Sequence, residues 1–243
     1  MSAPSGRQLP LALRYPPDQR LETFVAAPEG ALAQLRALAH AGGAGDPADG
    51  RPDWILIAGP AGVGKTHLAL AVCAAADVAG RRALYLPLKA AAGRLRAALD
   101  ALEGSDVVAL DGLDAIAGHR DDEVALFDFH NRARSAGLAV LYAAQATLDA
   151  LPLGLPDLRS RLAQCTRIIL SPLDDEGRLT VLRERAHRRG LVLEEAALDW
   201  LLKRVGRDLA GLTALLDQLD RASLEAQRRI TVPFLRKVLA AGD

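Results

Sequence analysis

The chain has 243 residues, half of them hydrophobic, and its 30 basic and 30 acidic residues give a formal net charge of zero at pH 7. Proteins that bind nucleic acid without sequence preference are usually basic, so this balance argues against that class. Two cysteines, Cys73 and Cys165, are too few for a disulfide framework or a zinc cluster, and we expect both to be buried as small apolar side chains.

The first 20 residues are interrupted by prolines and predict an irregular tail. Within it, the hexapeptide QLPLAL at residues 8–13 carries three leucines, although a segment so rich in proline forms neither a regular helix nor a central strand. The same prolines argue against a signal-peptide core, and no apolar run approaches the roughly 18 residues that span a membrane. We therefore expect a cytoplasmic protein that makes no membrane contact.

The segments that follow predict a parallel sheet covered on both faces. Residues 27–40 favour a helix, and residues 41–53 form a loop rich in Gly, Pro and Asp. Helices are also expected from Thr66 onward and over 121–137. Short apolar runs alternate with these helical stretches at 54–59, 82–88, 107–111, 138–144 and 167–170. This alternation is typical of βαβ units, in which each strand is buried on both sides.

The pattern changes at Ser171, after which no further strand is expected. Amphipathic spacing predicts helices at 174–188, 193–205, 208–227 and 232–241. The expected organisation is therefore a tail, an α/β base and a small all-helical domain, at residues 1–20, 21–170 and 171–243.

The segment GPAGVGKT, at residues 59–66, matches the P-loop pattern G-x-x-x-x-G-K-[ST] and lies between an apolar strand and a helix, which is the right context. Its glycines let the backbone fold closely around phosphate oxygens, and the amides at the start of the helix direct positive dipoles toward them. We expect Lys65 to reach the phosphates of ADP or ATP and the Thr66 hydroxyl to bind Mg²⁺. The predicted nucleotide-binding residues of this segment are Gly59, Pro60, Ala61, Gly62, Val63, Gly64, Lys65, Thr66 and His67.

The stretch VVALDGLD, at residues 107–114, supplies the acidic residue that a P-loop site needs. Asp111 ends a buried strand, where ligands lie in parallel sheets, and is the predicted partner of Thr66 in holding Mg²⁺. In ATP-hydrolysing P-loop proteins a second acidic residue directly follows, but here Gly112 stands at that position. Asp114 could replace it only if the chain bends suitably, and a turn residue is the favoured interpretation. We therefore expect a site that binds nucleotide well but hydrolyses it poorly on its own.

Two further segments, DLRSRL at 157–162 and GRDLAG at 206–211, carry arginines that could contact phosphate. Arg159 or Arg161 could project from the rim of the base into a neighbour's nucleotide site and stabilise charge on the transferring phosphoryl group. Arg207 could reach back from the helical domain onto a bound phosphate. The alternatives, a solvated surface charge for the first pair and an exposed helix-start residue for Arg207, stay open from spacing alone.

Several segments together carry a family resemblance. GPAGVGKTHL, YLPL, ALDGLD, FDFHNRARSAG, GLPDLRSRL and LDQLDRASLEAQRRITVPFLRKVL resemble AAA+ ATPases of the DnaA type, and more narrowly the Hda family of DnaA regulatory inactivators. The resemblance extends from Gln8 to about Leu239, and it implies a five-stranded parallel AAA+ base with helices on both faces and a small helical lid. It also implies that Arg161 is an arginine finger acting in trans, and that Arg207 contacts bound nucleotide from the lid.

The same resemblance gives the tail a role. QLPLAL is similar to the motif by which this family binds the replicative sliding clamp, which implies that Gln8, Leu9, Leu11 and Leu13 make the contacts. Ala12 departs from the motif, because a proline is common at its position. The alternative is a tail that folds back onto an apolar surface of its own protein.

The implied function is negative regulation of the initiation of chromosome replication. The DNA-loaded clamp, the beta subunit of the polymerase, would recruit the protein, and Arg161 would then promote hydrolysis of ATP bound to DnaA. The chain stops after the lid, so DNA contact is expected only through the clamp, while a homo-oligomer stays open. The alternatives are a stand-alone ATPase of the helicase-loader type and a scaffold with a structural P-loop. Gly112 disfavours the ATPase, as do Ala143 and Ala144, which end the fourth strand where a polar residue is usual and leave Gln145 as the nearest polar group.

Overall fold

The computed structural model describes the base and much of the helical domain; the described residues are 15, 19–25, 27–41, 54–191, 193–204, 216, 219 and 231–240. The clamp-motif residues 8–13 and Arg207 lie outside them. Within the described part, no helix combines the length and hydropathy needed to cross a membrane. The elements are η1 (Leu21–Thr23), α1 (Ala31–His40), β1 (Ile55–Ala58), α2 (Lys65–Val78), β2 (Ala83–Pro87), α3 (Leu88–Ala91), α4 (Leu95–Asp100), β3 (Val107–Asp111), η3 (Leu113–Ala115), α5 (Arg120–Ser135), β4 (Ala139–Ala144), α6 (Pro156–Ala163), β5 (Thr166–Ile169), α7 (Asp175–Arg188), α8 (Glu195–Arg204) and α10 (Val232–Ala240).

The five expected strands form one parallel sheet in the order β2-β3-β4-β1-β5, which confirms the predicted fold class. The strands β1 and β4 are buried at every residue, since both faces of the sheet are covered. In the register of the sheet, Asp111 lies beside Ala143 and Ala58 lies beside Ala144. The carboxyl ends of β3, β4 and β1 therefore meet at one edge, where ligands bind in parallel sheets.

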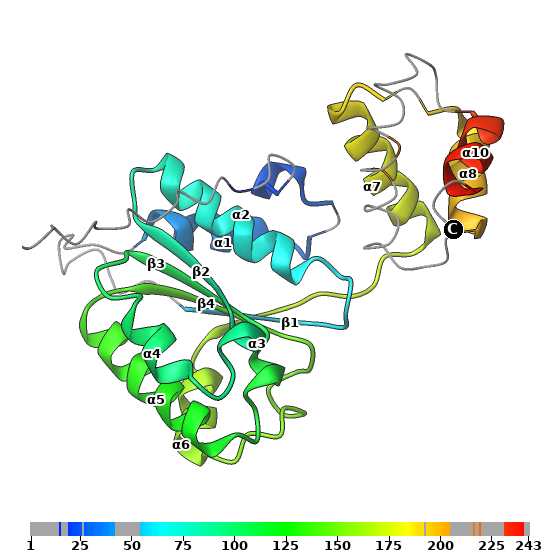
Figure 1. Ribbon diagram of the computed structural model, residues 1–243. Helices are drawn as coiled ribbons and strands as arrows, with labels where there is room; N and C mark the ends of the chain where they lie inside the picture. The colour runs from blue at the N-terminus through cyan, green and yellow to red at the C-terminus, as the bar shows by residue number, and fades with distance from the viewer. Residues whose placement is uncertain are drawn as a thin grey trace, which may run out of the picture.

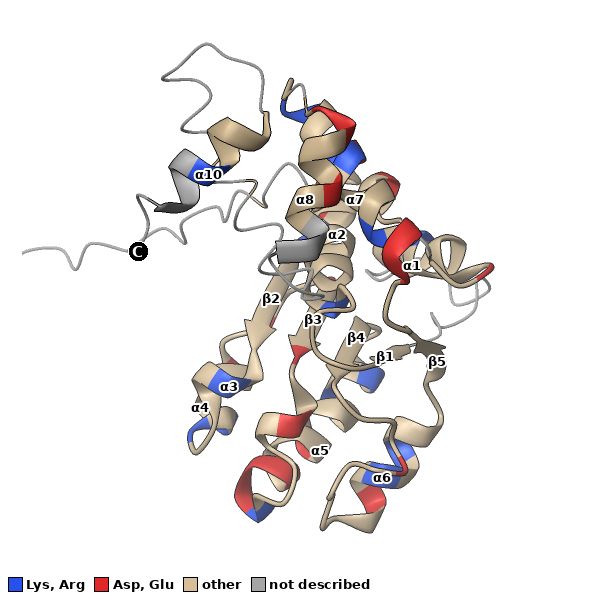
Figure 2. Ribbon diagram, turned by 90° about the vertical axis from the view of Figure 1, so that its right-hand side faces the viewer, with Lys and Arg blue, Asp and Glu red and all other residues tan. Residues whose placement is uncertain are grey.

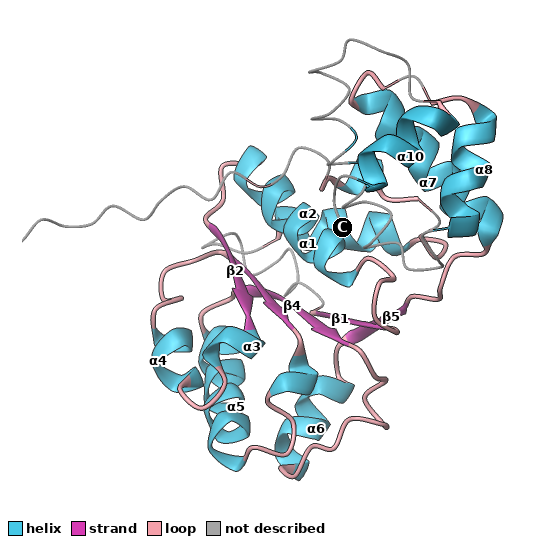
Figure 3. Cartoon of the chain, turned by 45° about the vertical axis from the view of Figure 1, so that its right-hand side comes forward, coloured by secondary structure: helices cyan, strands magenta, loops and turns pink. Residues whose placement is uncertain are grey.

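Helices cover the two faces of the sheet in separate layers (Figures 1 and 3). On one face, α1 and α2 pack against the strands through a core that includes Leu35, Leu68 and Ile57. On the other face, α3, α4, α5 and α6 pack through a core that includes Leu56 and Phe129. Neighbouring residues of β1 thus face opposite layers, as the two-residue period of a strand requires.

The helices α7, α8 and α10 stand beyond the sheet and have an apolar core of their own (Figure 3). The α7 helix begins as the sequence predicts, because the Asp174 side chain accepts a hydrogen bond from the Gly177 amide at 2.7 Å and so caps its first turn. Of the helix expected over 208–227, Leu216 and Leu219 are described, and both are helical and fully buried. The buried residues of this core are Leu182, Ala197, Leu198, Leu201, Leu216, Leu219 and Leu235.

Local geometry explains where the helices depart from the expected ranges. The α1 helix begins at Ala31 rather than at residue 27, because Gly30 has a left-handed φ of 73° and ends the preceding turn. The sequence analysis assigns no helix to residues 156–163, which lie at a proline-rich turn, but the structure has the α6 helix there. Pro156 lies in the first helical turn, where its fixed φ suits a helix and its missing N–H costs no bond.

Candidate nucleotide site and exposed arginine

The P-loop joins β1 to α2 and fits only glycine at two of its positions. Gly64 has φ of 97°, and a Cβ there would lie 2.6 Å from Cε2 of Phe24. A Cβ at Gly59 would collide with the carbonyl oxygen of Leu170, which belongs to the segment that follows β5. The loop therefore packs between Phe24 and Leu170. The α2 helix begins directly after it, at Lys65.

Lys65 is the buried cation of this loop, with 8% of its surface exposed. Its ammonium group donates hydrogen bonds to the carbonyl oxygens of Gly59 and Pro60, both at 2.6 Å. Burial lowers the pKa of Lys65, and the carboxylates of Asp111 and Asp114 offset part of that effect. Two carbonyl oxygens of the loop thus hold the Lys65 ammonium group. A phosphate oxygen can replace them as the acceptor of its hydrogen bonds.

Thr66, Asp111 and Tyr85 form a hydrogen-bonded group at the end of β3. The Thr66 hydroxyl donates to Oδ2 of Asp111 at 2.6 Å, and the Tyr85 hydroxyl donates to the same oxygen at 2.8 Å. Burial, and after it the Asp111 carboxylate, raises the pKa of Tyr85, so the phenol stays a donor at neutral pH. Mg²⁺ favours oxygen ligands and binds through one or two protein groups together with phosphates and water, so Thr66 and Asp111 fit this ion.

Asp114 is the acidic residue that follows Asp111 most closely, and its charge reaches Lys65, but its carboxylate is bonded to backbone amides. Gly112 has a left-handed φ of 89°, and its amide donates to the Ala143 carbonyl at 3.0 Å. The Asp114 carboxylate accepts the backbone amides of Gln145 at 2.6 Å and Ala146 at 3.2 Å. This geometry agrees with the turn interpretation, because Asp114 fixes the chain that leaves β4. Ala143 and Ala144 are fully buried, so the tip of β4 presents no polar side chain.

A mostly apolar pocket lies beside the P-loop, between residues 23–25 and α7. His67 contributes to its wall: its Nε2 lies 3.0 Å from the Arg20 carbonyl oxygen, and its ring packs edge-on against Phe24 with centroids 5.3 Å apart. Because the phosphate loop forms one side of this pocket, it suits the nucleoside part of a nucleotide. The lining residues are Thr23, Phe24, Val25, Val63, Gly64, His67, Leu170, Ser171, Leu173, Val181 and Arg185.

The two arginines of DLRSRL lie on α6 (Figure 2), where their environments differ sharply. Arg159 is half-buried, and its guanidinium donates to the carbonyl oxygens of Leu148, Leu151 and Leu153 at 2.9, 2.9 and 3.2 Å. Arg161 is exposed, and its guanidinium has no hydrogen bond or ion pair with any residue that the structure describes. Only Arg161 is therefore available to a partner.

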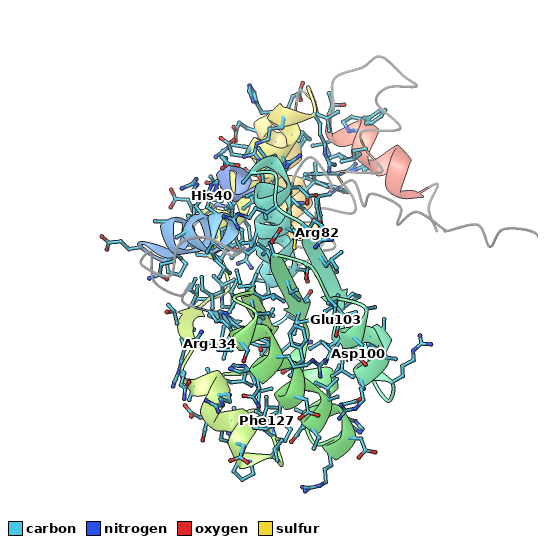
Figure 4. All side chains as sticks on the ribbon, turned by 90° about the vertical axis from the view of Figure 1, so that its left-hand side faces the viewer. His40, Arg82, Asp100, Glu103, Phe127 and Arg134 are labelled. Atoms are coloured by element: carbon cyan, nitrogen blue, oxygen red, sulfur yellow. The ribbon has the colours of Figure 1, made fainter. Side chains whose placement is uncertain are left out.

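A buried aromatic group lies close to Arg161. The Nδ1 atom of His130 and the Tyr142 hydroxyl lie 3.1 Å apart, and the His130 ring packs edge-on against Trp54 with centroids 4.4 Å apart. Arg134, labelled in Figure 4, places its guanidinium carbon 5.2 Å from the centroid of the Trp54 ring. Burial lowers the pKa of His130 to about 4, and the positive charges of Arg134 and Arg161 act in the same direction. His130 is therefore neutral at neutral pH and belongs to the packing of α5.

Sequence reasoning brought together most of this site but missed three of its parts. Tyr85 lies in the segment YLPL, to which the sequence assigns no role, and no pattern in the sequence indicates the inward bonds of Arg159. Phe24 belongs to no motif, and its place at the pocket beside the P-loop is seen only in the structure. The sequence does show a tyrosine in the strand predicted at 82–88. That tyrosine can be assigned to the nucleotide site only when the order of the strands in the sheet is known.

The strand order, the P-loop and the separate helical domain define a P-loop protein of the AAA+ class. The sequence profile of the ATPase family associated with various cellular activities matches residues 55–164, and that of the Hda lid domain matches residues 175–239. An uncharacterized protein of Haemophilus influenzae is 36% identical over 235 residues, which cover 96% of this chain and 99% of that protein.

Two solved structures show the same fold. Domain III of the Thermotoga maritima replication initiation protein DnaA superposes with a TM-score of 0.72 at 19% identity, covering 93% of this chain and 98% of that domain. AMPPCP-bound DnaA from Aquifex aeolicus gives a TM-score of 0.65 at 21% identity, covering 84% and 65% of the two chains. The chain belongs to the Hda/DnaA-type AAA+ family.

Proposed function

We propose that this DnaA-related protein is a negative regulator of replication initiation, which promotes hydrolysis of the ATP bound to DnaA by donating Arg161 in trans. The observation that carries the proposal is the contrast on α6, where Arg159 is bonded inward and Arg161 is exposed without a partner in the described part of the chain. A guanidinium that enters a neighbour's site stabilises charge on the transferring phosphoryl group, and such a residue can raise the rate by about 10³–10⁵.

The protein's own P-loop site would hold ADP or ATP with Mg²⁺ and contribute little hydrolysis. Lys65, Thr66 and Asp111 would hold the phosphates and the ion, which would neutralise phosphate charge, and their hydrogen bonds around the P-loop support this role. Low hydrolysis is expected because Gly112 has no side chain to orient an attacking water and the Asp114 carboxylate already accepts two backbone amides. A bound nucleotide would instead bring together the base and α7, and Arg207 is proposed to contact it from the lid.

Recruitment is proposed to occur through Gln8, Leu9, Leu11 and Leu13, which would bind the sliding clamp in the cytoplasm. Two residues after the motif, the Tyr15 hydroxyl donates to the Ala83 carbonyl of the edge strand β2 at 3.2 Å. A motif this close in sequence to Tyr15 would keep the AAA+ base near the clamp and so raise its local concentration near DnaA.

The test is hydrolysis of DnaA-bound ATP measured with DNA-loaded clamp and the purified protein. We expect Arg161→Ala to abolish the stimulation while keeping clamp retention, and the double change of Gln8 and Leu9 to Ala to lose clamp retention without a change in thermal stability. Arg167→Ala is the matched control, because Arg167 is an exposed arginine on the adjacent strand β5. Equal losses in the Arg161 and Arg167 variants would point to general charge attraction and contradict the finger.

A further inference from the structure

A side-chain hydrogen bond joins Tyr85 and Asp111 diagonally across two neighbouring strands. Tyr85 lies in the middle of β2 and Asp111 at the end of β3, and the two strands run side by side in the sheet. Both side chains are half-buried, and the phenol donates to Oδ2 of the carboxylate at 2.8 Å. The bond therefore joins an interior position of one strand to the metal-binding position of the next.

Asp111 receives little support from its own strand end. Gly112, the next residue, has no side chain and turns into a left-handed conformation. Asp114 is committed to the backbone after β4 through two hydrogen bonds. Thr66, which also donates to Asp111, is exposed and is itself a ligand candidate for Mg²⁺. Thr66 and Tyr85 both donate to the Asp111 carboxylate. Of these two, Tyr85 is the one that is neither exposed nor expected to bind the ion.

We propose that Tyr85 is a positioning residue, which fixes the Asp111 carboxylate in the orientation needed for Mg²⁺ in the nucleotide complex. The inference rests on the proposed nucleotide site, but it does not depend on DnaA or on the clamp. Groups that hydrogen-bond a metal-binding side chain typically change metal affinity 10–100-fold when they are removed. Removal of the Tyr85 hydroxyl should therefore weaken the contribution of Mg²⁺ while leaving the contacts of the loop with phosphate intact.

The experiment titrates the full-length protein with N-methylanthraniloyl-ADP, once in EDTA and once over a range of Mg²⁺ concentrations. For Tyr85→Phe we expect nucleotide affinity in EDTA within about twofold of wild type, and roughly tenfold more Mg²⁺ to reach the half-maximal effect. Tyr15→Phe is the matched control, because it removes a half-buried phenol that donates to the backbone of the same strand, at Ala83. This control should leave both values unchanged.

Each other outcome overturns the proposal. An equal loss of affinity in EDTA and in Mg²⁺ would show that Tyr85 only supports the fold, and an unchanged Mg²⁺ dependence would show that Asp111 needs no such support. If wild type fails to bind the ADP analogue at all, the nucleotide site itself is wrong, and Tyr85 loses its role with it. The DnaA assay with Arg161→Ala is separate, so failure of the trans-acting function is recognised independently.

Discussion

Replacing Arg159 by alanine tests whether the two arginines of α6 divide into a structural and a functional one. The Arg159 guanidinium holds the loop after β4 through the carbonyl oxygens of Leu148, Leu151 and Leu153, at 2.9, 2.9 and 3.2 Å. At a net value of about 1 kcal/mol for each hydrogen bond, Arg159→Ala should cost about 3 kcal/mol. For a chain of this length each kcal/mol lowers Tm by roughly 2–4 °C, so we expect a decrease of roughly 6–12 °C.

The comparison variant is Arg161→Ala, which removes an exposed side chain without a described partner and should change stability by about 0.5 kcal/mol or less. Both free energies are measured by guanidinium unfolding followed by circular dichroism, and Tm by thermal scans of the same samples. Two results would refute the reasoning. Arg161→Ala could destabilise as much as Arg159→Ala, which would make Arg161 a structural residue, or Arg159→Ala could cost less than about 1 kcal/mol, which would mean that its three bonds contribute little.

Three further changes follow from the geometry. Gly64→Ala places a Cβ 2.6 Å from Phe24 Cε2 at φ of 97°, so it should cost about 3 kcal/mol and abolish binding of an ADP analogue. Lowering the pH from 6.5 to 4 should cost up to about 3 kcal/mol through His130, because the unfolded chain takes up a proton that the buried ring, with its pKa lowered to about 4, does not. Denaturant titrations across this range should show a flatter pH dependence for His130→Gln. Asp114→Ala frees two backbone amides, one of them at Gln145, and should cost about 2 kcal/mol without altering the negligible ATP turnover expected of the isolated protein.

Controls separate these effects from general damage. Gly80→Ala introduces the same kind of strain, at φ of 75°, with no atom near the new Cβ, so a loss as large as that of Gly64→Ala would exclude the clash with Phe24 as the cause. The His130 argument fails if wild type and His130→Gln lose stability in parallel as the pH falls. Measurable ATP turnover by the wild-type protein that is lost on replacing Asp114 would give that carboxylate a catalytic role and contradict the turn interpretation.

The sequence by itself determined the strands, the nucleotide loop and the family. Strands buried on both faces must be continuous apolar runs, so β1 and β4 could be recognised without knowledge of their neighbours. The P-loop has fixed spacing because its glycines, Lys65 and Thr66 act within one local turn. The tail motif at residues 8–13 stays a prediction, since it lies outside the described residues.

Only the tertiary structure decided which side chains meet. Tyr85 and Asp111 are 26 residues apart, and they touch because β2 pairs with β3, a neighbour relation that no local pattern contains. Arg159 and Arg161 lie two positions apart on a helix, so their side chains point in directions about 200° apart around its axis. Arg159 therefore faces the loop after β4, and Arg161 faces solvent. This difference follows from the helix and its packing partners, and the spacing of the two arginines does not reveal it.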